Sequence, residues 1–442
     1  MSATAPSPAP VPASIAGFRK DRSGDLLQRC REFSAMLDTL RAEGDYPTQY
    51  RLELLSPLDH EIVVRDPLTS QPKRLVCFDS NSYLGLHLHP RVMAAARRAL
   101  DEAGAGTPSA PLLSGTSRWL RELEEIVAAF HGREAALVFP SGYAANIGIL
   151  TGLLRPGDFA VRDRYSHASL HDGCRFSGAR GSVYAHRDPT SAARAFARDD
   201  GRGGKLLVTD GVFSMHGSVA PLPELAAVAR DAGALLMVDE AHATGVVGAT
   251  GRGSEELFGL PGRIDVLMGT FSKAAGAAGG YVVGPRDLVD YLRFFARSAV
   301  FTASLPATVF AAVAEAFRLM DEDPAPRERL HENARRFTAS LEALGIAPLA
   351  SGTPIVAVRV GTQATLLHAG RALYDAGIRC GSVSYPAVPA DSCLLRFTVN
   401  ARHTNEELDR TAETLARVAA RHGFLGVGVP ADLRDPFDGE PS

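Results

Sequence analysis

The chain has 442 residues, a formal net charge of −3, 45% hydrophobic and 22% charged residues. This length exceeds one ordinary domain, and the composition is typical of a globular enzyme. A near-neutral charge disfavours a nucleic-acid or anionic-membrane partner, since both favour basic surfaces, and no apolar run is long enough for a membrane span.

The N-terminal region is expected to lie outside the catalytic body. Residues 1–14 are rich in Pro, Ala and Ser and are predicted to be disordered. A helical stripe over 26–41 predicts a helix that packs on the body without chemistry of its own. Five scattered cysteines without metal-like spacing, and no signal-peptide core, indicate reduced thiols in a cytoplasmic protein without a metal site.

Strands, polar loops and helices then alternate along the chain. Predicted strands cover 75–78, 135–139, 160–162, 182–185, 205–209, 235–238, 266–268 and 281–283. Predicted helices cover 91–103, 117–130, 191–198 and 222–232, and another ends at 153. This alternation predicts an α/β protein with a mostly parallel sheet covered on both faces, in which ligands bind at the carboxyl ends of the strands.

Residues with reactive or hydrogen-bonding side chains follow several of these strands. They are Ser141, His167, Ser214, Asp239, His242 and Lys273. Because the ends of parallel strands share one edge of a sheet, we expect these residues to converge on one site. Asn81 and Gly85 lie in a similar loop after the strand at 75–78.

Lys273 lies among small residues between two apolar runs. A buried lysine is costly unless it is paired or chemically used, so the pattern favours a Schiff-base lysine for pyridoxal phosphate (PLP). The alternative is a lysine that extends out of a tight turn. Asp239 is the candidate carboxylate for a protonated pyridine nitrogen, and His242 for the phenolic oxygen. For Asp239 and His242 the alternative is a metal pair or a strand-end cap.

The strand, turn and helix around Ser141 predict an anion site. Gly142 and Tyr143 would offer backbone N–H groups to a phosphate, with the hydroxyls of Ser214 and Thr270. An ordinary helix N-cap is the alternative. His167 is a candidate to stack on the cofactor ring, and the alternative is a simple hydrogen-bonding loop histidine.

Several motifs together resemble the α-oxoamine synthases, the fold-type I PLP enzymes that include 8-amino-7-oxononanoate synthase, 2-amino-3-ketobutyrate CoA ligase, 5-aminolevulinate synthase and serine palmitoyltransferase. The matching stretches are NSYLGL (81–86), SGYAAN (141–146), SHASLHDG (166–173), DGVFSMHG (210–217), VDEAHATG (238–245), GTFSKAAGAAGGY (269–281), FTASLP (301–306) and LLRFTVNARHT (394–404). The resemblance covers about residues 45 to 420 in the family's order.

The resemblance implies a PLP-dependent C-acyltransferase that condenses an amino acid with an acyl thioester of CoA or a carrier protein, usually with decarboxylation, to an α-amino ketone. It implies that Lys273 holds the cofactor and removes the α-proton, while Asn81 and Arg396 bind the amino acid carboxylate. His242 is a candidate to stabilise the thioester oxygen. The family also implies a homodimer with the site at its interface, near 301–304.

Four positions depart from the family pattern. Pro111 stands where the family usually has Arg, Leu120 where it has His, His216 where it has Asp, and Ala303 where it commonly has Thr. The first two remove polar groups from the glycine-rich loop at 104–120, where the acyl donor or the dimer partner is expected. We therefore expect a specialised synthase, in secondary metabolism, with an unusual acyl donor.

After Pro306 the pattern predicts a smaller α+β domain. Helices are expected at 307–320, 327–344, 365–376 and 405–422, and strands at 355–360, 378–380 and 394–399. The predicted division is an N-terminal arm at 1–60, a PLP-binding large domain at 61–305, a small domain at 306–425 and a tail at 426–442.

Two other functions compete with the acyltransferase. Another fold-type I enzyme, an aminotransferase or an aldolase-like enzyme, would bind PLP without needing a thioester. A non-catalytic partner subunit of a heterodimeric synthase should lack the Schiff-base lysine, so Lys273 weighs against it.

Overall fold

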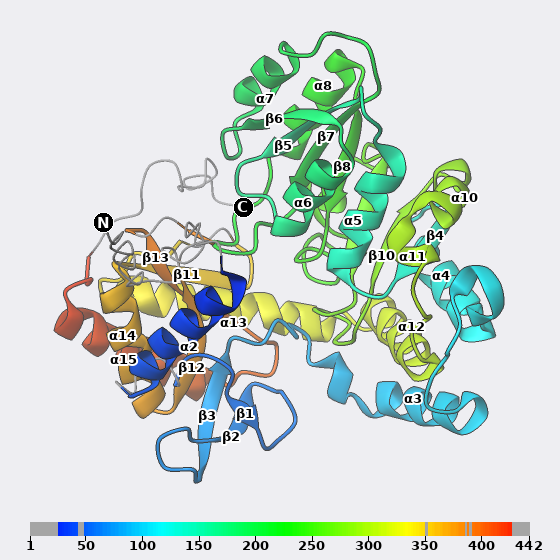
Figure 1. Ribbon diagram of the computed structural model, residues 1–442. Helices are drawn as coiled ribbons and strands as arrows, with labels where there is room; N and C mark the ends of the chain where they lie inside the picture. Colours follow the sequence, from blue (N-terminus) through cyan, green and yellow to red (C-terminus); the bar gives the residue numbers. More distant parts are fainter. Residues whose placement is uncertain (1–24, 43–47, 350–351, 385–386, 389–390, 427–442) are drawn as a thin grey trace, which may run out of the picture.

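The computed structural model describes residues 25–42, 48–349, 352–384, 387–388 and 391–426. Two sheets organise these residues (Figure 1). The seven-stranded sheet has the order β4-β10-β9-β8-β7-β5-β6, and the six-stranded sheet has the order β1-β2-β3-β12-β13-β11. The predicted disorder of 1–14 and nearly all of the predicted tail lie outside the described residues.

The large sheet is mostly parallel, as predicted. Its strands are β4 (Ala135–Phe139), β5 (Phe159–Asp163), β6 (Arg180–Tyr184), β7 (Lys205–Asp210), β8 (Leu235–Asp239), β9 (Val266–Thr270) and β10 (Gly280–Gly284). β10 runs antiparallel to both of its neighbours, β4 and β9, and β5 to β9 are mutually parallel. The predicted α/β class with a mostly parallel sheet is therefore confirmed.

Helices cover both faces of this sheet (Figure 1). Those that pack directly on its strands are α4 (Arg118–Phe130), α5 (Gly142–Leu153), α6 (Ala168–Phe176), α7 (Pro189–Phe196), α8 (Leu222–Ala232), α10 (Arg286–Phe295) and α11 (Arg297–Val300). Helices α3 (Pro90–Ala103) and α9 (Ser254–Leu257) lie in the connections between these elements. Strand alternation divides the core: Leu207 packs in one buried cluster with α4, α7 and α8, whereas Leu206 and Val208 pack in another with α5, α6 and α10. The strand ends are thus held between two packed layers.

The second sheet gathers segments from both ends of the chain. It contains β1 (Glu53–Leu54), β2 (Glu61–Arg65), β3 (Pro72–Phe78), β11 (Ile355–Gly361), β12 (Ile378–Val383) and β13 (Cys393–Thr398). Helices α13 (Ala325–Ala343), α14 (Gln363–Asp375) and α15 (Asn405–His422) belong to this part of the molecule. Short helical turns η1 (Leu86–Leu88) and η2 (Pro111–Gly115) lie in the loops around α3.

Two features of the sheets bear on the predicted division into domains, and a third feature bears on the predicted N-terminal helix. Strands β2 and β3 lie in the second sheet, because β3 pairs in parallel with β12, so the boundary predicted at residue 61 does not separate the two sheets. Helix α12 (Ala307–Glu322) packs on α3 and α4, so it belongs with the large sheet. The boundary predicted at residue 306 therefore does not separate the two sheets either. The predicted N-terminal helix is present as α2 (Leu26–Ala42), and none of its residues is fully buried. That it packs on the body stays a prediction.

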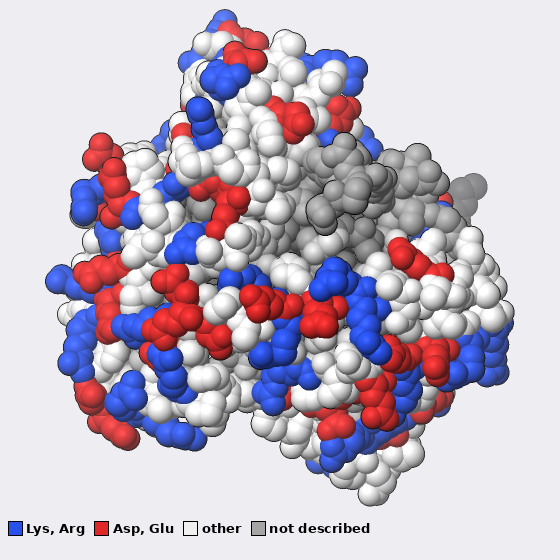
Figure 2. All heavy atoms as spheres, turned by 180° about the vertical axis from the view of Figure 1, so that it is seen from behind, with Lys and Arg blue, Asp and Glu red and all other residues white. Residues whose placement is uncertain are grey.

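The surface carries mixed charge. Figure 2 shows acidic and basic side chains interspersed on one face, without a continuous area of one sign among the residues drawn in colour. No helix in the described parts of the chain is both long and apolar enough to cross a membrane. The five cysteines are free thiols, as their spacing predicted.

Candidate active site

A cavity of about 210 Å³ lies at the carboxyl ends of β7, β8 and β9. It is lined by Ser141, Gly142, Tyr143, His167, Ser214, Asp239, His242, Thr270 and Lys273, together with Asn146, Asp210, Ala241, Met268 and Ser272. The structure therefore brings together all nine residues that the sequence assigned to a cofactor. The convergence follows from parallel strands ending at one edge.

Lys273 lies on the loop between β9 and β10. Its side chain keeps some exposed area because it borders the cavity, but its amine is deeply enclosed by protein atoms. Burial lowers the pKa of this amine to about 8; the charge of Arg396 acts in the same direction, while Asp239 and Asp210 oppose both. An appreciable fraction is therefore an uncharged nucleophile near neutral pH.

Asp239 ends β8 and is held in a fixed orientation. Its Oδ2 accepts a hydrogen bond from Asn146 Nδ2 at 2.7 Å, and its Oδ1 accepts one from the Ala241 N–H at 2.9 Å. Asn146 Nδ2 also donates to Ser169 Oγ at 2.9 Å. These two donors fix the orientation of the carboxylate.

Asp210 ends the neighbouring strand, directly opposite Asp239 in the parallel register. Burial, and next the charge of Asp239, raise the pKa of Asp210 well above its usual value. Asp210 Oδ2 accepts a hydrogen bond from the His167 N–H at 3.1 Å. Adjacent strands thus present two carboxyl groups with different roles: Asp239 faces the cavity with fixed donors, and Asp210 anchors the loop of His167.

The two histidines of the site differ in environment. His167 is the N-cap of α6, with Nδ1 2.7 Å from Ser169 Oγ, and its ring keeps an exposed face beside the cavity. His242 is buried, and burial followed by the charge of Lys273 lowers its pKa well below the usual value. His242 Nδ1 lies 2.6 Å from the hydroxyl of Tyr83, whose pKa burial raises to about 12. His242 is therefore a neutral imidazole held by a neutral phenol.

The first turn of α5 forms the other end of the cavity. Ser141 caps this helix, since its hydroxyl accepts from the Ala144 N–H at 3.1 Å, so the N-cap alternative holds for that side chain. Gly142 and Tyr143 follow as the first helical residues, whose N–H groups have no partner within a helix. A Cβ at Gly142 would lie 2.9 Å from Thr270 Oγ1, so only glycine lets the helix start approach β9 this closely.

Arg396 and Asn81 form a separate pair beside the cavity. Arg396, on β13, donates from Nη2 to Asn81 Oδ1 at 3.1 Å, although the two residues are 315 positions apart. The guanidinium is buried, and its Nε has no partner among the described residues. A buried, incompletely satisfied guanidinium suits an anionic ligand such as a carboxylate.

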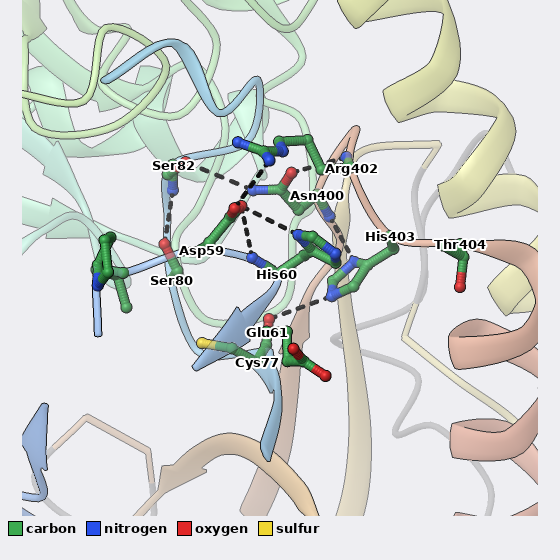
Figure 3. A network of polar contacts seen from close by, with 12 residues as sticks. Asp59, His60, Glu61, Cys77, Ser80, Ser82, Asn400, Arg402, His403 and Thr404 are labelled. Carbon is green, nitrogen blue, oxygen red and sulfur yellow. Dashed lines mark hydrogen bonds and ion pairs between the residues drawn. The ribbon is translucent and has the colours of Figure 1, made fainter. Parts of the chain in front are cut away.

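A polar network fixes the loop that carries Asn81 and Tyr83 (Figure 3). Asn400 Nδ2 donates to Ser82 Oγ at 3.4 Å, and the Asn400 N–H donates to His403 Nδ1 at 2.9 Å. The other ring nitrogen of His403, Nε2, lies 3.2 Å from the Cys77 carbonyl oxygen. The carbonyl of Tyr83 also accepts from the Ala401 N–H at 2.7 Å. The end of β3 is therefore tied to the loop after β13.

Sequence reasoning missed three residues of this site. Asn146 ends a motif that was recognised, but nothing in the sequence pairs it with Asp239. Asp210 ends a predicted strand just as Asp239 does, and that signal could have identified it. Tyr83 has a φ of 38°, which is unusual for a bulky residue. Nothing in the sequence predicts this backbone conformation.

The chain matches the family model described as aminotransferase class I and II over residues 73–415. It is 43% identical over 398 residues to the 8-amino-7-oxononanoate synthase of Geobacter metallireducens, covering 89% of this chain and 100% of that protein. The chain belongs to the aminotransferase class I and II family. This membership and the identity to an 8-amino-7-oxononanoate synthase confirm the predicted resemblance.

Two further relatives extend the comparison. The chain is 36% identical over 422 residues to the 4-hydroxy-2,2'-bipyrrole-5-methanol synthase PigH of a Serratia species, covering 95% of this chain but only 63% of PigH. A solved serine palmitoyltransferase with its PLP internal aldimine superposes with a TM-score of 0.84 and 33% identity, covering 90% of this chain and all of that one.

Among the described residues, no group of three or more His, Cys, Asp or Glu side chains is arranged to hold a metal ion.

Proposed function

We propose that this family member is a PLP-dependent C-acyltransferase that condenses an amino acid with an acyl thioester. The observation that carries the proposal is the shared cavity of Lys273, Asp239 and the first turn of α5. An enclosed amine, an oriented carboxylate and a helix N-terminus match the aldehyde, ring nitrogen and phosphate of PLP. The relatives named as 8-amino-7-oxononanoate synthase and serine palmitoyltransferase support the same reaction class.

The residues present fit this cofactor. Gly142 lets the first turn of α5 approach Thr270 closely, since a Cβ there would lie 2.9 Å from Thr270 Oγ1. Asn146 Oδ1 is buried without a partner among the described residues, so hydrogen-bonding capacity is left unfilled beside Asp239. Lys273 would bond to the aldehyde carbon, Asp239 would hold the ring nitrogen protonated, and His167 and Ala241 would flank the ring. Bound in this way, PLP supplies an electron sink for the carbanion at the amino acid's α-carbon.

The protein's own side chains would then divide the work. Arg396 and Asn81 would bind the carboxylate of the amino acid, and the uncharged amine of Lys273 would take the α-proton. The α-carbon forms a bond to the acyl carbon of the thioester, the carbon–sulfur bond breaks, and the thiolate leaves with the electron pair. His242, neutral and held by Tyr83, would donate to the thioester oxygen in the transition state.

The two finer parts of the proposal are decarboxylation and a specialised acyl donor. Loss of the carboxylate as CO₂ after condensation would give the α-amino ketone. Pro111 begins the short turn η2 in the 104–120 segment. Leu120, which was expected in the same loop, instead lies on α4 and is buried in the core, so only Pro111 supports an altered loop. The similarity to PigH is compatible with a product other than that of a housekeeping synthase.

A homodimer would complete the site. Exposed apolar side chains lie on η2, on α10 and directly after α11, and these elements contact one another or α5. Leu113 is 78% exposed, Phe294 65% and Phe301 73%. Tyr143 of α5 is also largely exposed and lines the cavity. An apolar face of this kind at the mouth of a site supports coverage by a second copy of the chain.

The test is a screen of the holoenzyme with each amino acid, following the visible absorbance of the bound cofactor, before and after an acyl-CoA is added. We expect one amino acid to perturb the absorbance, the acyl-CoA to be consumed only in its presence, and mass spectrometry to identify the condensation product. Turnover with a 2-oxo acid and no thioester would instead establish an aminotransferase.

A further inference from the structure

Arg379 joins three parts of the chain that lie far apart in the sequence. It lies on β12, and its side chain is only partly exposed. Its Nε donates to Asp79 Oδ2 at 2.6 Å, while Nη1 donates to the Thr48 carbonyl at 3.1 Å and Nη2 to the Gln49 carbonyl at 2.6 Å. Each nitrogen of this guanidinium therefore has an acceptor, which fixes the position of the group.

The segment at 48–49 that supplies the two carbonyls is itself held in the body of the protein. Both of its residues are buried. Gln49 Nε2 donates to the Leu367 carbonyl at 2.7 Å, and Gln49 Oε1 accepts from the hydroxyl of Ser382. A Cβ at Gly370 would lie 2.5 Å from Gln49 Oε1, so this glycine of α14 makes room for the amide. The two carbonyls therefore form a fixed seat for a guanidinium.

Arg379 and Arg396 project from the same face of the second sheet. Gly381, two positions after Arg379 on β12, lies opposite Arg396 on β13 in the antiparallel register. Side chains two positions apart on a strand share a face, and so do residues directly opposite each other on neighbouring strands. Both guanidinium groups reach the loop after β3, which Arg379 contacts at Asp79. Arg396 contacts the same loop at Asn81, two positions later.

The charge of Asp79 acts on Arg396. Burial lowers the pKa of the Arg396 guanidinium, whereas the charges of Tyr83 and Asp79 raise it. The Asp79 side chain is only 26% exposed, so water screens this attraction incompletely. Arg396 Nε has no hydrogen-bond partner among the described residues. An unpaired carboxylate at Asp79 would therefore compete with a bound carboxylate for Arg396.

We propose that Arg379 is a positioning residue that reserves Arg396 for the carboxylate of the amino acid. It does so by neutralising Asp79 and holding that side chain toward the seat at 48–49, while the same loop presents Asn81. The inference rests on the proposed function, since it takes the ligand of Arg396 to be an amino acid. Without Arg379, a partly buried negative charge would be left unpaired beside Arg396.

The experiment compares amino acids with the amines that lack their carboxylate. The holoenzyme is titrated with each of the common amino acids and with the matching amine, such as alanine and ethylamine, and dissociation constants are read from the absorbance of the bound cofactor. Arg379→Gln should raise the dissociation constant of the amino acid about tenfold, because Asp79 then competes for Arg396. The dissociation constant of the matching amine should not change, because an amine does not need Arg396.

A second substitution distinguishes competition by Asp79 from a loss of structure. When Asp79→Asn is added to Arg379→Gln, the unpaired charge disappears, and the dissociation constant of the amino acid should return to within about threefold of the wild-type value. Gln49→Ala removes the side-chain contacts of the seat but keeps its carbonyl. It should raise the dissociation constant of the amino acid roughly threefold, and Asp79→Asn should reverse this rise as well.

The matched control is Arg336→Gln, which also removes an ion pair between two elements of the same part of the molecule. Arg336 Nη2 on α13 lies 2.6 Å from Asp409 Oδ2 on α15, and neither residue contacts the loop after β3. Chemical denaturation measures the stability that each variant loses. The control should leave the dissociation constants of both ligands unchanged even where it loses as much stability as Arg379→Gln.

The outcomes separate this inference from the proposed function. Absence of an absorbance change with every amino acid in the wild type would refute the proposed function, and this inference with it. A wild type that binds an amino acid but consumes no acyl thioester would refute the condensation alone. Equal rises for the amino acid and its amine in Arg379→Gln, or a double variant that binds the amino acid no better than Arg379→Gln, would overturn the role of Arg379 alone.

Discussion

The two ends of the active site are built in different ways. At the cofactor end, Asp210, Asp239 and Thr270 each end a strand of one sheet, and their positions follow from the register of neighbouring strands. At the carboxylate end, Arg396 and Asn81 meet only because the second sheet joins segments more than 300 positions apart. The first end is therefore fixed by local strand geometry, and the second by long-range packing that substitutions far from the ligand can loosen.

The largest effect is expected at the cofactor end. Lys273→Ala removes both the covalent anchor and the proton acceptor, so product formation should fall by at least about 10³-fold, in line with losses of groups that act as a unit. The visible absorbance of the bound cofactor should also change. Lys205→Ala is the control, since Lys205 pairs with Asp199, 3.2 Å away, at the other end of β7. Near-wild-type turnover without Lys273 would contradict its role.

At the carboxylate end, Arg396→Ala should raise KM for the amino acid roughly 10- to 100-fold, because a charge-assisted hydrogen bond is lost. KM for the acyl donor should stay within about twofold of the wild-type value, because Arg396 would contact only the amino acid. Arg396→Lys should recover little, because an ammonium cannot reproduce the two-pronged contact. Equal losses for both substrates would show that Arg396 supports the whole site rather than one ligand.

Asn146 tests whether orientation of Asp239 matters in its own right. Asn146→Ala removes the 2.7 Å hydrogen bond to the carboxylate, so kcat should fall roughly tenfold while KM for both substrates changes little. The absorbance maximum of the bound cofactor should shift, because the charge beside the ring nitrogen is less well held. A lower melting temperature without a change in absorbance or kcat would assign Asn146 a structural role only.

The pKa of Lys273 makes a pH prediction. Burial lowers that pKa to about 8. The fraction of Lys273 that is uncharged therefore rises about tenfold per pH unit below pH 8 and levels off above it. The rate at which PLP recombines with the apoenzyme should follow the same curve between pH 6 and pH 9, measured by stopped-flow absorbance. A flat profile would mean that the amine is already uncharged throughout this range.

The smallest effect is expected from the network of Figure 3. His403→Ala leaves the Asn400 N–H without its acceptor, which should cost about 1–3 kcal/mol of folding free energy. KM for the amino acid should rise a few-fold through displacement of Asn81, and the absorbance of the bound cofactor should not change. Chemical denaturation and steady-state kinetics measure the two effects separately, and a change in cofactor absorbance would show that the two ends are coupled.

The same contrast explains what the sequence could predict. Period-2 and period-3.6 patterns located the strands and helices of the large sheet, so the convergence of Ser141, Asp239 and Lys273 followed from topology alone. The positions of β2, β3 and α12 could not be assigned, because short strands and amphipathic helices do not encode which sheet they join. Tyr83 and Asn146 were missed for the same reason: their roles depend on partners 159 and 93 positions away.

Within the described residues, the chain passes between the two sheets at two places. The first is the loop from β3 to α3, which contains Asn81 and Tyr83, and the second is the corner at Pro324 between α12 and α13. Asn81 lies on the first of these crossings, and its side chain contacts Arg396 of the second sheet. The contact proposed for the amino acid carboxylate is therefore built on the same segment that connects the two sheets.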